Sequence, residues 1–547
     1  MAPSPPQPPS LQSSIQTSTS TWQTNLHSLF KLAKERFPDV VWELMADEDD
    51  IDAAHVPEEV WGHKGPSLCL VRFNILFNLL CVAAIVYARA PPSFQARYFS
   101  FRPAPIGTPS ELLTSPNGTL NGQSALSLSD FHDLTPYRAG SPSPSTAPST
   151  TPGTILRLPT SINPALFANE LEYLYTGKGF GAAFEFLFDT SESREEGDAE
   201  ENRVDKLRKD LVFMWRSRLY SDVRIALTGS FSYSSSTNHE NATAIFSSHR
   251  FILVSRSPYF HNQLLSWPST KPPQDAPLTL NLPSPPFTPA SLHFTLGYIY
   301  TGTLVFSHRG YDLDTAFHIM RAATYLAIDP LYDEIQARIV QEMMHGLFHA
   351  FLDFSEYEHV TGGKWGTGGC RCRQCARRAP RTLEFALADD VRNPHLERGA
   401  RRALVGLFGE GWCTSEFAGL PSKTRESLLK GLAKRTTPLN IFPLLFAAQH
   451  AMDKLNAVID AWADTSREMV LAARRVIDDV LCARAEECFE LPEWVEILEG
   501  DGTRFDDGEK VKWVLESLKR GLTDRSAAMV YQVCISLYLP PVLINAL

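Results

Sequence analysis

Three cysteines stand within six positions of one another in a glycine-flanked segment of this 547-residue chain. Cys370, Cys372 and Cys375 follow a Cys-x-Cys-x-x-Cys spacing. Thiolates this close together can wrap around a small soft cation, and Zn²⁺ takes sulfur and imidazole ligands in a tetrahedral arrangement. The sequence therefore offers three of the four ligands of a zinc site, with His359, eleven positions upstream, or Cys413 as the fourth.

Thiols without a bound metal are the competing interpretation, because the spacing does not fix a fourth ligand. The arginines of this segment would help to deprotonate the thiols, or could form a small phosphate-binding patch. These arginines are Arg371, Arg373, Arg377, Arg378 and Arg381. The chain has only nine cysteines, too few for a disulfide framework, which favours a reducing compartment such as the cytoplasm or the nucleus.

Motifs for catalysis are lacking in the rest of the sequence. It contains no glycine-rich phosphate loop, no nucleophile elbow and no His-Glu-x-x-His. We therefore expect no enzymatic activity and no small-molecule substrate. The 62 acidic residues outnumber the 51 basic ones, and the net charge of −11 argues against binding nucleic acid through an overall basic surface.

The part of the chain before the cysteine segment is organised as an internal repeat. Each copy has an amphipathic helical stretch, a strand that begins at Asp-Val, a Leu-x-Leu-Pro strand, and a helix that ends in Tyr-x-Tyr-Thr-Gly. The matching segments are RFPDVVWEL (36–44) with RLYSDVRIAL (218–227), LRLP (156–159) with LNLP (280–283), and YLYTG (173–177) with YIYTG (298–302). The alternation of Val223, Ile225 and Leu227 predicts a strand in the second copy, and Gly302 can adopt the left-handed conformation that ends a helix.

In the second copy the pieces SDVRIAL, FSSHRFILVSRSPYF, LTLNLP and YIYTG follow one another, and in combination they resemble the BTB/POZ domain. The resemblance implies a full unit at residues 204–345 and a degenerate unit at residues 22–180. The implied fold class is α+β, with two units that each have a three-stranded sheet and flanking helices, followed by an all-α region at residues 382–547. A helical region in this place is similar to the BTB-BACK arrangement, by analogy alone.

Two segments interrupt the first copy. Residues 65–83 are apolar, but as a membrane helix they would bury Arg72, at a cost of about 2.5–3.5 kcal/mol, so we expect no membrane association. They could form an insertion helix packed on the domain. Our preferred hypothesis is a gene model that read through a short intron, because deleting them restores HKAIVYARAPPSF beside HRFILVSRSPYF. Residues 101–155, rich in proline and serine, predict a disordered loop.

Composition predicts three further segments outside the repeated units. Residues 1–21 hold mainly Pro, Ser, Thr and Gln with little to bury, so we expect a disordered tail. Residues 181–203 predict an acidic, solvated linker. Residues 346–381, which contain the three close cysteines, predict a loop rich in Cys, Gly and Arg.

The resemblance also implies a set of interface residues. In BTB domains that dimerise, an Asp at the start of the strand and a basic residue after a His form a charged pocket at the interface. The matching residues are Asp222, His249 and Arg250 in the second copy, and Asp39, His63 and Lys64 in the first. A local salt bridge within each unit is the alternative. We expect either a homodimer or an intramolecular pseudo-dimer of the two copies.

The resemblance implies a protein-interaction scaffold that uses its BTB domains for self-association and partner binding. Adaptor work for a cullin-type ubiquitin ligase is a narrower form of this function. Cullin-binding BTB domains usually carry a hydrophobic-x-Glu motif between the Tyr-Phe helix and the next strand, and HNQLLSWPSTKPPQDAPLTL (261–280) has none. The alternative is a nuclear transcriptional or chromatin cofactor whose Cys/Arg segment contacts nucleic acid.

Overall fold

The structure is a computed structural model. It describes residues 8–38, 40–44, 58–62, 89, 156–160, 164–178, 199–218, 221–228, 243–266, 278–499 and 507–536. The segments 65–83 and 101–155, with the predictions made for them, lie outside the described residues, as do residues 181–198 of the expected linker.

Two three-stranded sheets in the described chain have the same topology. Their strands are β1 (Val40–Leu44), β2 (Glu58–Gly62) and β3 (Leu156–Thr160) in the first sheet, and β4 (Val223–Thr228), β5 (Thr243–Ser248) and β6 (Leu278–Pro283) in the second. The strand orders are β2-β1-β3 and β5-β4-β6. In both sheets the central strand pairs antiparallel with the strand that follows it and parallel with the third.

Helices accompany both sheets. The first has α1 (Leu11–Lys31), a short 3-10 helix (Ala33–Glu35) and α4 (Pro164–Thr176). The second has α6 (Ala199–Arg216), α7 (Arg250–Arg256), α8 (Pro258–His261), a π-helical turn (Asn262–Ser266), α9 (Pro289–Thr301), α10 (Leu313–Tyr325), α11 (Asp329–Arg338) and a π-helical turn (Ile339–Met343). Residues 199–203, expected in the linker, thus form the first part of α6, so the sequence-based boundary at 203 was five residues too late.

Helix α9 forms the centre of the second unit. Thr288 and Ser291 form a reciprocal capping box at its start, which satisfies two of the backbone N–H groups that a helix leaves without partners. Tyr298 and Tyr300 near its end are fully buried. Gly302 ends the helix with a φ of +67°, which confirms the predicted left-handed cap.

Helix α1 contradicts the expected disordered tail over residues 11–21. Ser10 caps the helix by accepting a hydrogen bond from the Ser13 N–H at 3.2 Å. Ser18 is buried; its hydroxyl accepts from the Tyr298 hydroxyl at 2.9 Å and donates to the Pro330 carbonyl at 3.3 Å. Small polar side chains let the helix come close to its neighbours, so tertiary packing supplies the stabilisation that composition alone does not indicate.

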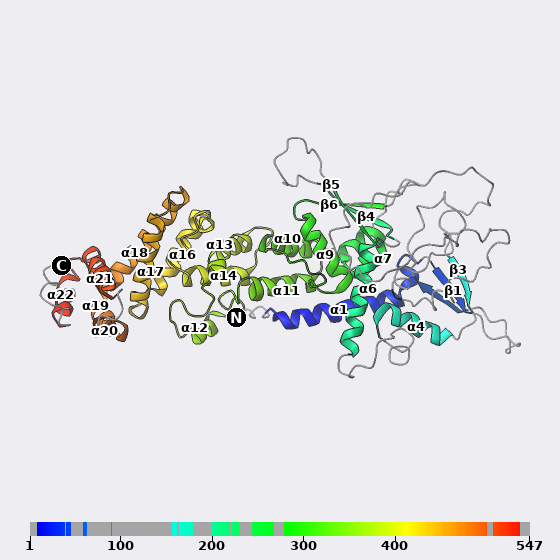
Figure 1. Cartoon of the computed structure of the whole chain (residues 1–547), viewed down its shortest axis with the longest axis horizontal. Coiled ribbons are helices and arrows are strands. Elements are labelled where there is room, and N and C mark those ends of the chain that lie inside the picture. Colours follow the sequence, from blue (N-terminus) through cyan, green and yellow to red (C-terminus); the bar gives the residue numbers. More distant parts are fainter. Residues whose placement is uncertain are drawn as a thin grey trace, which may run out of the picture.

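The remaining described residues are helical, and the chain is elongated, with the two sheets near one end and the C-terminal helices at the other (Figure 1). The helices are α12 (Phe354–Thr361), α13 (Arg373–Leu387), α14 (Pro394–Gly406), α15 (Ser415–Ala418), α16 (Ser422–Arg435), a 3-10 helix (Pro438–Asn440), α17 (Ile441–Asn456), α18 (Trp462–Ala483), α19 (Ala485–Phe489), α20 (Pro492–Glu499), α21 (Asp507–Gly521) and α22 (Ala527–Ser536). The segment 346–381, expected as a loop, therefore holds α12 and the start of α13. Phe317 of α10 stacks on Phe385 of α13 at 4.0 Å between ring centroids, which joins the helical region to the second unit.

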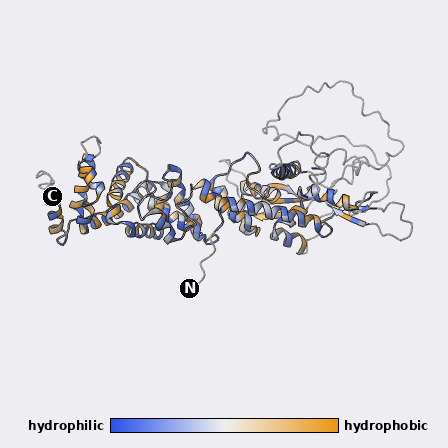
Figure 2. Ribbon diagram, turned by 90° about the horizontal axis from the view of Figure 1, so that it is seen from below, coloured by the Kyte–Doolittle hydropathy of each residue, from blue (hydrophilic) through white to orange (hydrophobic). Residues whose placement is uncertain are grey.

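Hydrophilic residues are spread along the helices throughout the molecule (Figure 2). Among the described residues, no helix combines the length and the apolar character that crossing a bilayer would require.

His293 of α9 gives the second unit a predicted sensitivity to acid. Burial, together with Arg309 and Arg216, lowers the pKa of His293 from 6.5 to about 4. The unfolded chain then binds a proton between pH 6.5 and pH 4 that the folded chain does not, so stability should fall as the pH is lowered through this window. Urea unfolding at several pH values should show this fall, and His293→Gln should make it shallower; identical pH dependence in the two proteins would contradict the prediction.

Candidate functional site

The three close cysteines lie around a histidine that the sequence prediction did not include. The Nδ1 atom of His345 is 3.2 Å from the Cys370 Sγ, 3.6 Å from the Cys372 Sγ and 3.5 Å from the Cys375 Sγ. One ligand atom from each of the four residues falls within 4.8 Å of all the others. The four residues therefore form a compact cluster of soft metal-ligand types.

Two elements bring this cluster together. His345 follows the π-helical turn that ends the second unit, and the cysteines stand at the start of α13. Cys372 is the N-cap of α13, and its Sγ accepts a hydrogen bond from the Cys375 N–H at 3.4 Å. The Cys375 Sγ lies 3.5 Å from the Met344 carbonyl oxygen, so the helix start and the end of the second unit are in direct contact.

The thiols of the cluster differ in acidity. Burial acts to raise the pKa of Cys372, but hydrogen bonds from the Cys375 N–H and from the neighbouring thiols outweigh it and lower the pKa to about 6. Burial and the thiols of Cys372 and Cys370 raise the pKa of Cys375. An N-capping thiol of low pKa is the type that becomes a thiolate near neutral pH, the form that binds metals.

Neither of the fourth ligands suggested by the sequence joins the cluster. His359 lies exposed in the last turn of α12. Cys413 is buried elsewhere, its Sγ hydrogen-bonds to the Ala451 carbonyl oxygen at 3.6 Å, and burial raises its pKa to about 11. His345 is farther along the chain from Cys370 than His359 is. Its position at the end of the predicted second unit was the sequence signal that could have indicated His345 as the fourth ligand.

The predicted interface residues of the second unit form a salt bridge within that unit. Asp222 accepts from the Arg250 backbone N–H and from its Nε, each at 2.7 Å. The Arg250 guanidinium also lies 4.4 Å from the centroid of the Phe37 ring, which precedes β1 of the first sheet. The pair thus matches the local alternative and lies beside the residues that lead into β1. Asp39, His63 and Lys64 are outside the described residues.

His249 belongs to the core of the second unit. Its side chain is buried, and its Nδ1 lies 2.6 Å from the Tyr300 hydroxyl. The same hydroxyl accepts from the His249 N–H at 3.1 Å and lies 3.0 Å from the Ser248 hydroxyl. The imidazole thus ties the start of α7 to the end of α9, and the expected role of His249 at an interface stays a prediction.

Most arginines of the cysteine segment contact other protein groups. Their partners are the Trp365 ring for Arg371, the Glu416 carboxylate for Arg377, the Met343 carbonyl for Arg378 and the Asp314 carboxylate for Arg381. Guanidiniums used in this way contribute less to an electrostatic surface for phosphate.

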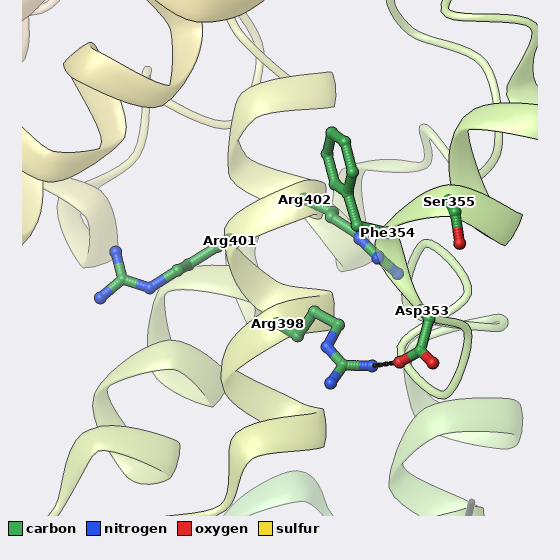
Figure 3. Close-up of a pocket in the computed structure, with 6 residues that line it drawn as sticks. All are labelled: Asp353, Phe354, Ser355, Arg398, Arg401 and Arg402. Atoms are coloured by element: carbon green, nitrogen blue, oxygen red, sulfur yellow. Dashed lines mark hydrogen bonds and ion pairs between the residues drawn. The ribbon is translucent and has the colours of Figure 1, made fainter. Parts of the chain in front are cut away.

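A shallow basic pocket beside α14 is a further candidate site. It is lined by Asp353, Phe354, Ser355, Arg398, Arg401 and Arg402 (Figure 3). Arg398 donates to Asp353 at 3.2 Å, and the Arg402 guanidinium lies 4.2 Å from the centroid of the Tyr357 ring. Arg401 points away from Asp353 in Figure 3 and pairs with a carboxylate of its own helix. Each guanidinium already has a protein partner, so the pocket does not suggest a ligand.

Part of the chain matches a known protein family. No curated protein matches the chain at a significant level. Residues 236–343, from the chain between β4 and β5 to the end of the π-helical turn after α11, match the family model of the BTB/POZ domain. The chain thus contains a module whose general role is protein–protein interaction.

Proposed function

We propose that this protein is a non-catalytic interaction scaffold of the cytoplasm or nucleus, in which two BTB-like units, one built around each three-stranded sheet and including α1 and α6 respectively, pack on each other within one chain. The BTB/POZ match at residues 236–343 is the observation that carries the interaction role. The common strand order of the two sheets supports extending the same fold to the first unit.

Equivalent side chains support the repeat in finer detail. Arg89 and Arg256 occupy matching places in YARAPPSF and VSRSPYF. Arg89 donates to the Leu174 carbonyl, and Arg256 donates to the Ile299 carbonyl at 3.1 Å. Both carbonyls belong to the residue between the two tyrosines of the Tyr-x-Tyr-Thr-Gly segment. The register between the central and the third strand differs by two residues, because Leu158 is paired with Trp42 whereas Leu282 is paired with Leu227. A shift of two residues preserves the alternation between the two faces of a strand.

Reciprocal packing of the two leading helices supports an intramolecular pair. Helix α1, which precedes the first sheet, contacts α7, α9 and α11 of the second unit. Helix α6, which precedes the second sheet, places Asp210 at 3.2 Å from Arg89 of the first unit. The two helices also contact each other, because Arg208 donates to the Thr19 hydroxyl at 2.8 Å. Helix α1 thus packs on the second unit, and α6 reaches the first unit through the ion pair of Asp210 with Arg89.

An intramolecular pair would take the place of the interface between two separate BTB chains. Arg250, expected at a dimer interface, contacts Phe37 of the same chain. We therefore expect the full-length protein to be a monomer. Size-exclusion chromatography with light scattering at micromolar concentration should give a mass that matches the 61.0 kDa chain. A stable species of twice this mass would contradict the intramolecular pair.

A more specific form of this proposal is that the scaffold binds a cullin and serves as an adaptor of a cullin-type ubiquitin ligase. Pull-down of a cullin with the full-length chain tests it separately, and no association at micromolar concentration would leave the scaffold function without the adaptor role. No observation favours the nucleic-acid alternative, since four arginines of the cysteine segment are already in contact with protein groups.

A further inference from the structure

We propose that His345, Cys370, Cys372 and Cys375 form a structural zinc site that fastens the helical region to the BTB unit. The proposal is independent of the scaffold function, because it rests on the geometry and chemistry of these four side chains.

The distances in the cluster fit one tetrahedral ion. With Zn–S bonds of about 2.3 Å and a Zn–N bond of about 2.0–2.1 Å, a regular tetrahedron places the nitrogen about 3.6 Å from each sulfur. The three distances from the His345 Nδ1 are 3.2, 3.6 and 3.5 Å. The nitrogen-to-sulfur distances therefore already match a tetrahedral site, and all pairs of ligand atoms lie within 4.8 Å of one another.

The donor set is of the kind that holds zinc in closed structural sites. Three thiolates and one imidazole complete a four-coordinate shell and leave no open position for a substrate or an activated water. The three cysteines are free thiols in the structure, which keeps all three sulfurs available as ligands. Cys370 and Cys372 are partly exposed, and Cys375 is buried, so an ion can enter from solvent and still rest against the protein.

The backbone around His345 has a strained conformation that a bound metal would stabilise. His345 opens a turn in which five successive residues, 345–349, have φ values between +40° and +92°. The left-handed conformation costs about 1–2 kcal/mol for each residue with a side chain. Phe348 of this turn packs against Gly369, where a Cβ atom would lie 2.2 Å from the ring. A bond from His345 to the ion would hold the strained turn against the segment that carries the cysteines.

The ion would also cross-link distant parts of the chain. The ligands His345 and Cys370 are 25 positions apart, and α12 lies between them. Metal binding that requires the folded arrangement stabilises the folded state. The helical region after residue 370 would thereby be oriented relative to α11 and the end of the BTB unit.

The test is metal analysis of the tag-free, full-length protein purified under reducing conditions. We expect one zinc ion per chain, together with an intense sulfur-to-cobalt charge-transfer band and tetrahedral d–d bands after replacement by Co²⁺. His345→Ala and Cys372→Ser should lose stoichiometric zinc, whereas the matched control His359→Ala, an exposed histidine outside the cluster, should keep it.

Measurements on the unaltered chain keep the test decisive if a ligand variant fails to fold. Removal of zinc with a strong chelator should lower the Tm, and one equivalent of zinc should restore it. No bound zinc after reconstitution, or a Co²⁺ spectrum without thiolate bands, would overturn the proposal. Full zinc binding by His345→Ala would overturn His345 as the fourth ligand.

Discussion

Replacing Trp22 by alanine is expected to lower the free energy of unfolding by about 3–5 kcal/mol, the usual cost of deleting a large buried aromatic side chain. Trp22 of α1 is fully buried, and its Nε1 donates to the Tyr300 carbonyl at 2.9 Å. Its ring lies against the end of α9, where a Cβ atom on Gly302 would be 2.5 Å from the Trp22 Cβ. The substitution removes this contact and leaves the carbonyl of Tyr300 without its donor.

Gln16→Ala is the matched control, because Gln16 lies on the exposed side of the same helix. Urea unfolding followed by circular dichroism should give a lower midpoint for Trp22→Ala and an unchanged midpoint for Gln16→Ala. Equal midpoints for the two variants would mean that α1 does not pack on the second unit as described.

Glu334→Ala is expected to destabilise the protein by about 3–5 kcal/mol, because it removes one partner of a buried ion pair. The Glu334 carboxylate is fully buried, and its Oε1 accepts from the Arg338 Nε at 3.0 Å. The same oxygen accepts from the Leu304 N–H at 3.4 Å. Without Glu334, the chain after α9 loses a contact with α11, and the Arg338 guanidinium, only 6% exposed, loses its buried partner.

Glu342→Ala is the matched control, because it removes a carboxylate that pairs with the same arginine but is exposed rather than buried. Glu342 pairs with the same Arg338 at 2.8 Å, but its side chain is 50% exposed, and exposed ion pairs contribute only about 0–1 kcal/mol. Chemical unfolding should therefore show a large loss for Glu334→Ala and a small one for Glu342→Ala. Comparable losses in the two variants would refute the assigned role of the buried carboxylate.

Strand β4 and helix α9 could be predicted because their signals are local. Val223, Ile225 and Leu227 alternate along β4 and are all buried, and Gly302 marks the end of α9 by its own conformational freedom. These features depend on neighbouring residues in the chain, so a single sequence is sufficient to indicate them.

Helix α1 could not be predicted from composition, because its stabilisation comes from residues far away in the chain. Ser18 would be a solvated residue in an isolated helix, and its hydroxyl is instead satisfied by Tyr298 and Pro330. Low apolar content indicates disorder only when no preformed surface is available to receive the segment.

Only the cysteines of the metal-ligand cluster were predicted, because His345 is also brought to the cluster by residues far away in the chain. The three cysteines are close in the sequence, so their spacing indicates that they lie together. His345 approaches them through the left-handed turn after the last helix of the second unit, and nothing in the local pattern around the cysteines indicates that approach. Distance along the chain favoured His359, which α12 places outside the cluster.

The packing of α1 on α11 has a consequence for synthesis on the ribosome. Helix α1 ends at Lys31, and its partner α11 ends at Arg338, which is 307 residues later. At about 5–20 residues per second, the buried face of α1 must wait roughly 15–60 s before the last of its partner helices, α11, has been translated. The folded position of α1 is therefore completed only after the second sheet and its helices have been made.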